Sequence, residues 1–143
     1  MEVIEREGSL LERLPDVYDR MCPSRGVLEH VTSRWGVLVL VALLERGYRF
    51  SELRRRVSGV SEKMLAQTLQ NLERDGFVLR VAHPVIPPRV DYSLTPLGEE
   101  AAERVSGLAH FVEARMCAVA EARERYDTRQ GTAEADRGAA QGR

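Results

Sequence analysis

The sequence predicts a mainly α fold of the α+β type, and three observations support this prediction. Residues 51–74 show a short helical pattern, a turn that contains Gly59 and a longer capped helical pattern, which together are typical of a helix-turn-helix. Hydrophobic residues then alternate with a period of two within residues 77–94, as in a β-hairpin. After Thr95, apolar residues recur at helical spacing over about thirty residues, which predicts one long C-terminal helix.

The chain has 143 residues, of which 43% are apolar and 30% charged, enough for one domain with a hydrophobic core. We expect an N-terminal extension (1–21) that is partly helical and able to stabilise a dimer, a domain (22–127) and a disordered tail (128–143). No apolar run is long enough to span a membrane or to act as a secretion signal, so a cytoplasmic protein without membrane contact is predicted.

Two helices are expected before the helix-turn-helix, over residues 24–32 and 34–45, because apolar residues recur there at intervals of three and four. Gly47 ends the second of them. Ser51 is the expected N-cap of the short helix that follows.

The helix that begins at Ser61 has the clearest start signal in the chain. The hydroxyl of Ser61 can accept a hydrogen bond from a first-turn N–H, and Val60 and Leu65 occupy the two positions of a hydrophobic staple. The hairpin after it closes through the sequence HPVIPP, whose three prolines fix φ and remove three N–H donors. We therefore expect a stiff, projecting loop with Arg89 beside it.

Thr95 and Pro96 are the expected N-cap and first residue of the C-terminal helix. An apolar stripe runs along this helix, and a helix of that length extends beyond a small domain. Part of the stripe therefore needs a second chain, and a two-fold dimer is the commonest solution. The expected dimerisation residues are Leu97, Ala101, Val105, Leu108, Val112, Met116 and Val119.

One face of the helix from Ser61 has the composition of a DNA-binding surface. At 100° per residue, leucines form one side of the helix and a carboxylate-free stripe lies opposite, made of Lys63, Gln67, Gln70 and Arg74. Long donors without a carboxylate suit the major groove, because a carboxylate would repel the phosphates. An ordinary solvated helix face is the alternative interpretation. The other DNA-binding candidates on this helix are Ser61, Met64, Thr68 and Asn71.

Basic residues elsewhere extend the predicted surface. Residues 44–92 hold eight Arg and one Lys against six Asp and Glu, a net charge of +3, whereas the whole chain carries −1. Arg55 and Arg56 lie on the first helix of the pair, which in this motif crosses the phosphate backbone. Arg89 lies at the hairpin tip, where it can reach the backbone or a minor groove.

Five segments stand in an order that is typical of one protein family: Cys22-Pro23, Arg34-Trp35, RFSELRRRVSGVSEKML, LERDGFVLR and PPRVDYSLTPLG. Through them, over about residues 22–115, the chain resembles the HxlR-type winged helix-turn-helix transcription regulators of bacteria, which are MarR-like. The resemblance implies a homodimeric DNA-binding regulator. The helix from Ser61 would be its recognition helix, and the hairpin around Arg89 its wing.

The chain departs from the usual pattern of this family at two places. Ser33-Arg34 stands where such proteins usually have Gly-Lys before the tryptophan, which keeps the charge and loses the glycine. Many relatives also have arginines at the positions of Thr68 and Gln70. Because fewer cations mean fewer phosphate or guanine contacts, the operator sequence cannot be transferred from relatives.

Cys22 is a redox-sensing candidate. It precedes Pro23 at the expected start of a helix, where the helix dipole can lower the pKa of a thiol. Some of the regulators that the chain resembles use a cysteine at this position to sense oxidants or electrophiles. An inert thiol is the alternative, and packing is the expected role of Cys117 in the predicted dimer helix.

The sequence contains no Gly-rich phosphate loop, no nucleophile elbow and no histidine pair at metal-ligand spacing. We therefore expect no enzymatic activity, no metal and no cofactor.

These observations predict a sequence-specific regulator that represses transcription by occupying a promoter. A two-fold dimer would place its recognition helices about 34 Å apart, so the operator should be an inverted repeat with half-sites roughly 10 bp apart. A winged helix that binds another protein without DNA is the main alternative. A second alternative is a regulator with a small-molecule or oxidant effector that enters between the dimer helices and the core.

Overall fold

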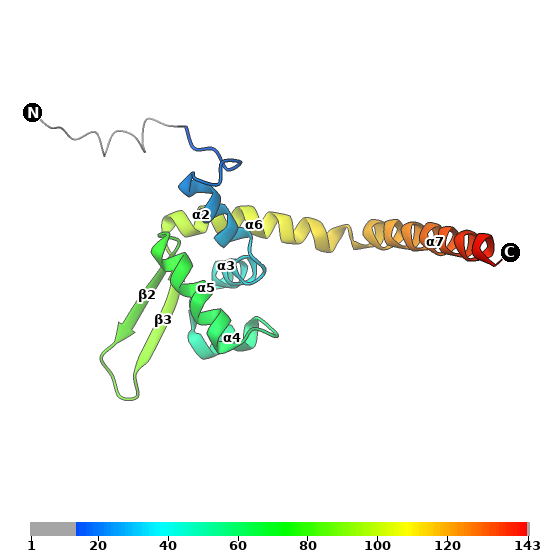
Figure 1. Cartoon of the computed structure of the whole chain (residues 1–143). Coiled ribbons are helices and arrows are strands. Elements are labelled where there is room, and N and C mark those ends of the chain that lie inside the picture. Colours follow the sequence, from blue (N-terminus) through cyan, green and yellow to red (C-terminus); the bar gives the residue numbers. More distant parts are fainter. Residues whose placement is uncertain (1–13, 143) are drawn as a thin grey trace, which may run out of the picture. The chain divides into compact units, whose positions relative to one another are not determined.

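The computed structural model describes residues 14–142, so the first thirteen residues of the predicted N-terminal extension lie outside the described part. Residues 14–22 form turns, and the partial helix predicted for the extension is not found in them. The chain divides into two units after Ser106. The elements, which Figure 1 labels where there is room, are α2 (Pro23–Thr32), α3 (Arg34–Glu45), β1 (Tyr48–Arg49), α4 (Phe50–Arg56), α5 (Glu62–Arg74), β2 (Val78–His83), β3 (Arg89–Leu94), α6 (Pro96–Ala114) and α7 (Met116–Gln141).

The two helices predicted before the helix-turn-helix are confirmed as α2 and α3. Ser33 separates them, and its hydroxyl accepts a hydrogen bond from the N–H of Gly36 at 3.1 Å, which caps α3. In residues 14–142, no single helix is long and apolar enough to cross a membrane, and α2 and α3 reach that length and composition only as a pair bent by 69°. Within the fold, α3 supplies Val39 and Leu40 to the core.

The predicted helix-turn-helix is present as α4 and α5, but α4 begins earlier than expected. Its N-cap is Arg49 and not Ser51, which lies inside the helix. The backbone N–H of Arg49 donates to Oε1 of Glu52 at 3.0 Å, so a carboxylate one turn ahead caps the helix instead of a hydroxyl. Gly59 in the turn to α5 has φ +90°, a conformation that other residues adopt only with strain.

The predicted hairpin is confirmed and carries a third strand. β2 and β3 pair antiparallel with Val78 opposite Leu94 and His83 opposite Arg89. β1 adds to the other side of β3, with Tyr48 opposite Tyr92, which gives the strand order β1-β3-β2. A two-residue strand is too short to show a period of two, so the sequence pattern did not reveal it.

The core lies among α3, α4, α5, the sheet and the first half of α6. Its fully buried large side chains are Val39, Leu40, Leu53, Leu65, Leu69 and Leu72. α6 starts as predicted: Oγ1 of Thr95 accepts a hydrogen bond from the N–H of Gly98 at 3.0 Å. A Cβ at Gly98 would lie 1.9 Å from the carbonyl oxygen of Phe77, so only glycine lets α6 pack this closely on the start of the hairpin.

The predicted single C-terminal helix is two helices, because α6 ends at Ala114 and α7 begins at Met116. The N–H of Arg115 donates to the carbonyl oxygens of Phe111 and Val112, at 3.1 and 3.2 Å, and this shared bond tightens the last turn of α6. The apolar spacing continues across the break, so the break could not be predicted from that spacing.

Residues 128–141, predicted to be disordered, are helical and belong to α7. Eight of its fourteen residues are Ala, Arg or Gln, which favour helix without needing an apolar face. No residue of α7 is buried, so local propensity and not packing accounts for the helix.

Candidate nucleic-acid interface

The start of α5 is built as the sequence predicts. Oγ of Ser61 accepts a hydrogen bond from the N–H of Met64 at 3.1 Å. Val60 and Leu65 are both buried, as the two positions of a hydrophobic staple require. The cap and the buried leucines hold α5 against α3, so the opposite face of α5 has a defined orientation.

The predicted stripe on that opposite face is exposed. Lys63, Gln67, Gln70 and Arg74 all lie at the surface, and Met64 beside them is also exposed. Within residues 14–142, Lys63 and Arg74 make no ion pair. The nearest carboxylate at the helix start, Glu62, is held by Arg54 at 2.9 Å. The stripe therefore presents donors and cations that no carboxylate neutralises.

Two candidates on α5 are less available than predicted. Thr68 is only 8% exposed, and its hydroxyl donates to the carbonyl oxygen of Met64 at 2.7 Å, so it does not face a ligand. Its position three residues after Leu65 places it beside the buried side of the helix. Asn71 is partly buried, and its Oδ1 accepts a hydrogen bond from Nε2 of Gln67 at 3.1 Å. Asn71, one helical turn after Gln67, thus fixes the orientation of the Gln67 amide.

Of the three consecutive arginines of α4, two form ion pairs with neighbouring carboxylates. Arg54 pairs with Glu62 at 2.9 Å and Arg56 pairs with Glu45 at 2.6 Å. The hydrogen bond from Arg56 lowers the pKa of Glu45 and correspondingly raises the pKa of Arg56, so both groups stay charged at neutral pH. Arg55 is exposed and makes no ion pair in the described part of the chain. Of the two predicted backbone contacts, only Arg55 is unpaired.

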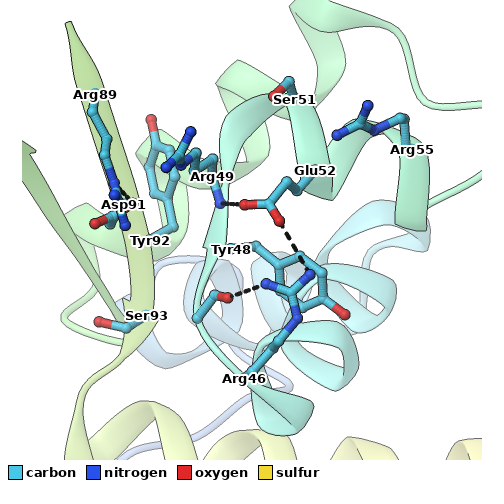
Figure 2. A pocket seen from close by; sticks show the side chains of 11 residues that line it. Arg46, Tyr48, Arg49, Ser51, Glu52, Arg55, Arg89, Asp91, Tyr92 and Ser93 are labelled. Atoms are coloured by element: carbon cyan, nitrogen blue, oxygen red, sulfur yellow. Dashed lines mark hydrogen bonds and ion pairs between the residues drawn. The ribbon is translucent and has the colours of Figure 1, made fainter.

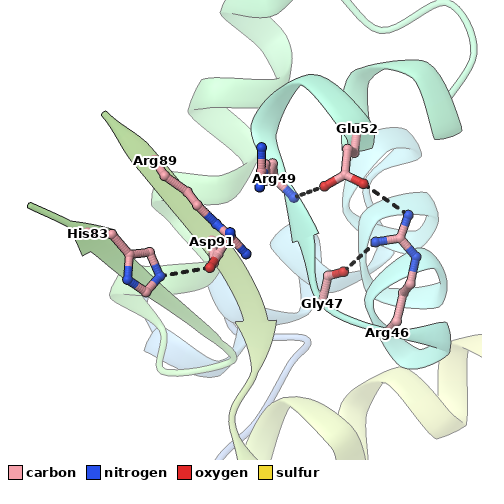
Figure 3. A network of polar contacts seen from close by, with 7 residues as sticks. All are labelled: Arg46, Gly47, Arg49, Glu52, His83, Arg89 and Asp91. Atoms are coloured by element: carbon pink, nitrogen blue, oxygen red, sulfur yellow. Dashed lines mark hydrogen bonds and ion pairs between the residues drawn. The ribbon is translucent and has the colours of Figure 1, made fainter. Parts of the chain in front are cut away.

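The wing carries a network of polar contacts, which Figure 3 shows, and an apolar tip. Nε of Arg89 lies 3.1 Å from Oδ1 of Asp91, and Nε2 of His83 lies 2.7 Å from Oδ2 of the same residue. These contacts, that of Arg89 foremost, lower the pKa of Asp91, so it remains ionised at neutral pH. At the tip, Ile86 is 100% exposed. Arg89 therefore lies at the wing tip as predicted, but as half of an ion pair.

Two basic residues that were not predicted from the sequence belong to the same region. Arg49 lines a cavity of about 580 Å³ with Arg55 and Arg89, and Figure 2 shows all three side chains around it. Arg80 on β2 lines a cavity of about 370 Å³ together with Gln70. Recognition of β1 in the sequence would have placed Arg49 beside the hairpin and so identified it.

Cys22 is the N-cap of α2, and its thiol is surrounded by hydrogen-bond partners. Its Sγ lies 3.0 Å from Oγ of Ser24 and 3.5 Å from the backbone nitrogen of Asp16. The contact with Ser24, followed by that with Asp16, lowers the pKa of the thiol, although the carboxylate of Asp19 opposes the shift. The nearby cation Arg25 lies 3.6 Å from the carboxylate of Glu29.

The predicted dimerisation stripe separates into two groups. Val105 is buried and Ala101 packs against the core, so these two residues stabilise the subunit itself. Leu97 is half exposed. The exposed apolar residues of the second unit include Leu108, Phe111, Val112, Met116 and Val119. Cys117, in the same segment, is exposed and not packed within the chain.

Two histidines each lie against an aspartate. His30 contacts Asp75 at the end of α5, and His83 contacts Asp91 in the wing. Among residues 14–142, no three His, Cys, Asp or Glu side chains are grouped as a metal would require.

Comparisons with known proteins agree with this geometry. The model of the HxlR-like helix-turn-helix family matches residues 30–119. An uncharacterized HTH-type transcriptional regulator of Escherichia coli (strain K12), YtfH, is 59% identical over 110 residues, which are 76% of this chain and 87% of YtfH. The solved structure of ytfH from Salmonella typhimurium is 57% identical, with a TM-score of 0.75 over 78% of this chain and 99% of that one. The redox regulator HypR in its oxidized form is 30% identical, with a TM-score of 0.60 over 65% of this chain and 96% of that one.

Proposed function

Because the chain belongs to the HxlR-like helix-turn-helix family of transcriptional regulators, we propose that it binds double-stranded DNA sequence-specifically as a homodimer. It represses transcription by occupying a promoter, and it acts in the cytoplasm. α5 enters the major groove, α4 lies over the phosphate backbone, and the wing reaches the adjacent minor groove.

One observation supports this function best, the exposed and carboxylate-free stripe of α5. Lys63 and Arg74 supply unpaired cations, and Gln67 supplies an amide that is oriented by Asn71. A glutamine amide can form two hydrogen bonds with adenine, whereas the cations suit guanine or phosphates. The leucine-lined underside fixes the backbone of α5, so little backbone entropy is lost on binding.

The exposed apolar residues of the second unit support the dimer. Leu108, Phe111, Val112 and Met116 would remain in contact with water in a monomer, and such a set commonly marks a protein interface. A two-fold dimer recognises two identical half-sites, roughly 10 bp apart, in an inverted repeat.

Selection of binding sites from random double-stranded DNA with the purified protein tests this function. We expect an enriched inverted repeat, and an affinity that falls steeply as salt rises because bound phosphates release counterions. No enriched sequence, together with a salt-independent interaction with another protein, would instead support the protein-interaction module. An enriched single half-site without symmetry would contradict the dimer but keep DNA binding.

We further infer that oxidation of Cys22 changes the affinity for DNA. The lowered pKa favours the thiolate, which is the form that peroxides and quinones attack. The likeness to HypR, a redox regulator, agrees with this role. Mass spectrometry after mild peroxide or quinone treatment should find Cys22 modified, and gel shifts of the treated protein should differ from those of the reduced protein. An unmodified Cys22 would rule the sensor out.

A further inference from the structure

A polar cavity of about 580 Å³ lies between α4 and β3, at the junction of two elements that the proposed function places against DNA. Its lining comes from β1 and α4, which are consecutive in the chain, and from β3, which is distant from them in the sequence (Figure 2). Four arginines contribute to it, against two carboxylates. The lining residues are Arg46, Gly47, Tyr48, Arg49, Ser51, Glu52, Arg55, Arg89, Asp91, Tyr92 and Ser93.

The two carboxylates are already occupied. Glu52 accepts hydrogen bonds from the side chain of Arg46 at 3.2 Å and from the backbone N–H of Arg49 at 3.0 Å. Asp91 holds Arg89 on the other wall of the cavity at 3.1 Å. Figure 3 shows these two groups of contacts, one around Glu52 and the other around Asp91. Glu52 and Asp91 thus neutralise two of the four guanidinium groups.

The other two guanidinium groups have no such partner. Neither the side chain of Arg49 nor that of Arg55 makes a hydrogen bond or an ion pair with any residue from 14 to 142. Four arginines against Glu52 and Asp91 leave the cavity with a net charge of +2. Ser51 adds a hydroxyl donor at the rim.

We propose that this cavity binds a phosphate group, with the guanidinium groups of Arg49 and Arg55 as its ligands. Each guanidinium presents a planar pair of N–H donors that matches two phosphate oxygens, and two of them balance up to two negative charges. The cavity is larger than a phosphate alone, so there is room for an attached sugar. Arg46 and Arg89 are bound to Glu52 and Asp91 in the walls of the cavity, so their guanidinium groups are not the ligands of the phosphate.

The phosphate can come from two sources, a linkage of the DNA backbone or a free phosphate ester that acts as an effector. The position beside α4 favours the first source, and this part of the inference rests on the proposed DNA-binding function. The chemistry of recognition is the same in both cases, so two arms of one experiment distinguish them.

The first arm uses DNA in which single linkages of the selected operator are replaced by uncharged methylphosphonates. If the cavity holds a backbone phosphate, one linkage in each half-site lowers the affinity of the unaltered protein about tenfold, the size expected when a charged hydrogen bond is removed. The double variant Arg49→Gln/Arg55→Gln should bind unmodified DNA more weakly and should show no further loss at that linkage.

The second arm titrates the full-length protein, without DNA, with ribose 5-phosphate and with ribose. If the cavity takes a free ester, ribose 5-phosphate binds saturably, ribose does not, and the double variant binds neither. Arg104→Gln is the control for the single variant Arg55→Gln, because Arg104 is exposed on α6, its substitution removes the same single charge, and it does not line the cavity. Thermal unfolding checks that the double variant folds, and Arg55→Gln alone replaces it if it does not.

Either dependence on Arg49 and Arg55 supports the inference and identifies the source. If the protein binds its operator but no linkage couples to the two arginines, and ribose 5-phosphate does not bind, the inference is overturned while the proposed function stands. If the protein binds no DNA at all, the proposed function fails, and the ribose 5-phosphate titration alone decides the inference.

Discussion

At the residue scale, the partners of each side chain decide what it offers to DNA. Lys63 and Arg74 on α5 are unpaired, whereas Arg56 on α4 is held by Glu45 at 2.6 Å. A paired guanidinium must break its ion pair before it can reach a phosphate. The free energy needed to break the pair reduces the contribution of that arginine to DNA binding. Exposure alone therefore does not identify a DNA contact.

Lys63 and Gln67 should behave differently when truncated. Lys63→Ala should weaken binding to all sequences and reduce the slope of log affinity against log salt by about 0.9 for each phosphate that is no longer neutralised. Gln67→Ala should change preference at one base pair, by about 1–3 kcal/mol, and leave the salt slope unaltered. Gel shifts at several salt concentrations, with operator variants, measure both effects. If neither substitution has an effect, α5 is not the recognition helix.

The reactivity of Cys22 should depend on Ser24. Their contact is the largest cause that lowers the thiol pKa, so Ser24→Ala should raise that pKa. Because the thiolate is the reactive form, the pH at which alkylation reaches half its maximal rate should move upward, and the rate below that pH should fall. Alkylation is measured in a Cys117→Ser background. Ser58→Ala, at an exposed turn position, is the control, and an unchanged profile in Ser24→Ala would contradict this cause.

Local sequence was sufficient where the physical cause is local. The cap at Ser61 and the exposure of Gln67 follow from spacing along one helix. The loss of Arg56 as a free cation could not be predicted, because its partner Glu45 lies on another helix, 11 residues away. Arg89 was placed correctly at the wing tip, but its pairing with Asp91 depends on side-chain orientation that spacing does not give.

At the scale of elements, the N-terminus of α5 has two roles, a cap that stabilises the helix and a proposed position close to the DNA phosphates. Substitutions of Ser61 can separate them. Ser61→Ala removes the cap and should lower the free energy of unfolding by about 1 kcal/mol. Ser61→Asp keeps a cap and favours the helix dipole, so stability should be retained, but its carboxylate would face the DNA phosphates and weaken binding. Urea unfolding and gel shifts measure the two effects. Wild-type DNA affinity in Ser61→Asp would place the start of α5 away from the phosphates.

Element starts were predicted better than element ends. A capping residue marks the start of a helix, as Thr95 does for α6. Few types of side chain can accept hydrogen bonds from the free N–H groups of the first turn, so the residue type is informative. The end of α6 at Ala114 has no glycine or proline to mark it, and the strand β1 is only two residues long. The start of α4 was missed because a glutamate, Glu52, caps it through the backbone of Arg49.

At the scale of the whole molecule, the basic excess of residues 44–92 lies on the elements that carry the predicted DNA contacts. The chain as a whole has a net charge of −1, so attraction to DNA must come from this local excess. The fold class was predictable because several signals agree: the helical period before residue 76, the alternation after it and the cap at Thr95. The partner that covers the exposed apolar residues was inferred only from the length of the predicted C-terminal helix and the apolar stripe along it.

Dimerisation should depend on the exposed apolar residues of the C-terminal segment. Val112→Asp places a carboxylate in the proposed interface, where its burial without a partner should weaken dimerisation roughly a hundredfold. Ala114→Asp adds the same charge on α6 but about 160° from Val112, at 100° per residue, and should weaken the dimer much less. Sedimentation velocity over a range of concentrations measures both variants. Because a monomer can occupy only one half-site, Val112→Asp should also lose the tight binding to the inverted repeat while keeping weak binding to a half-site. A fully dimeric Val112→Asp would place the interface elsewhere and would leave the exposed stripe to another partner.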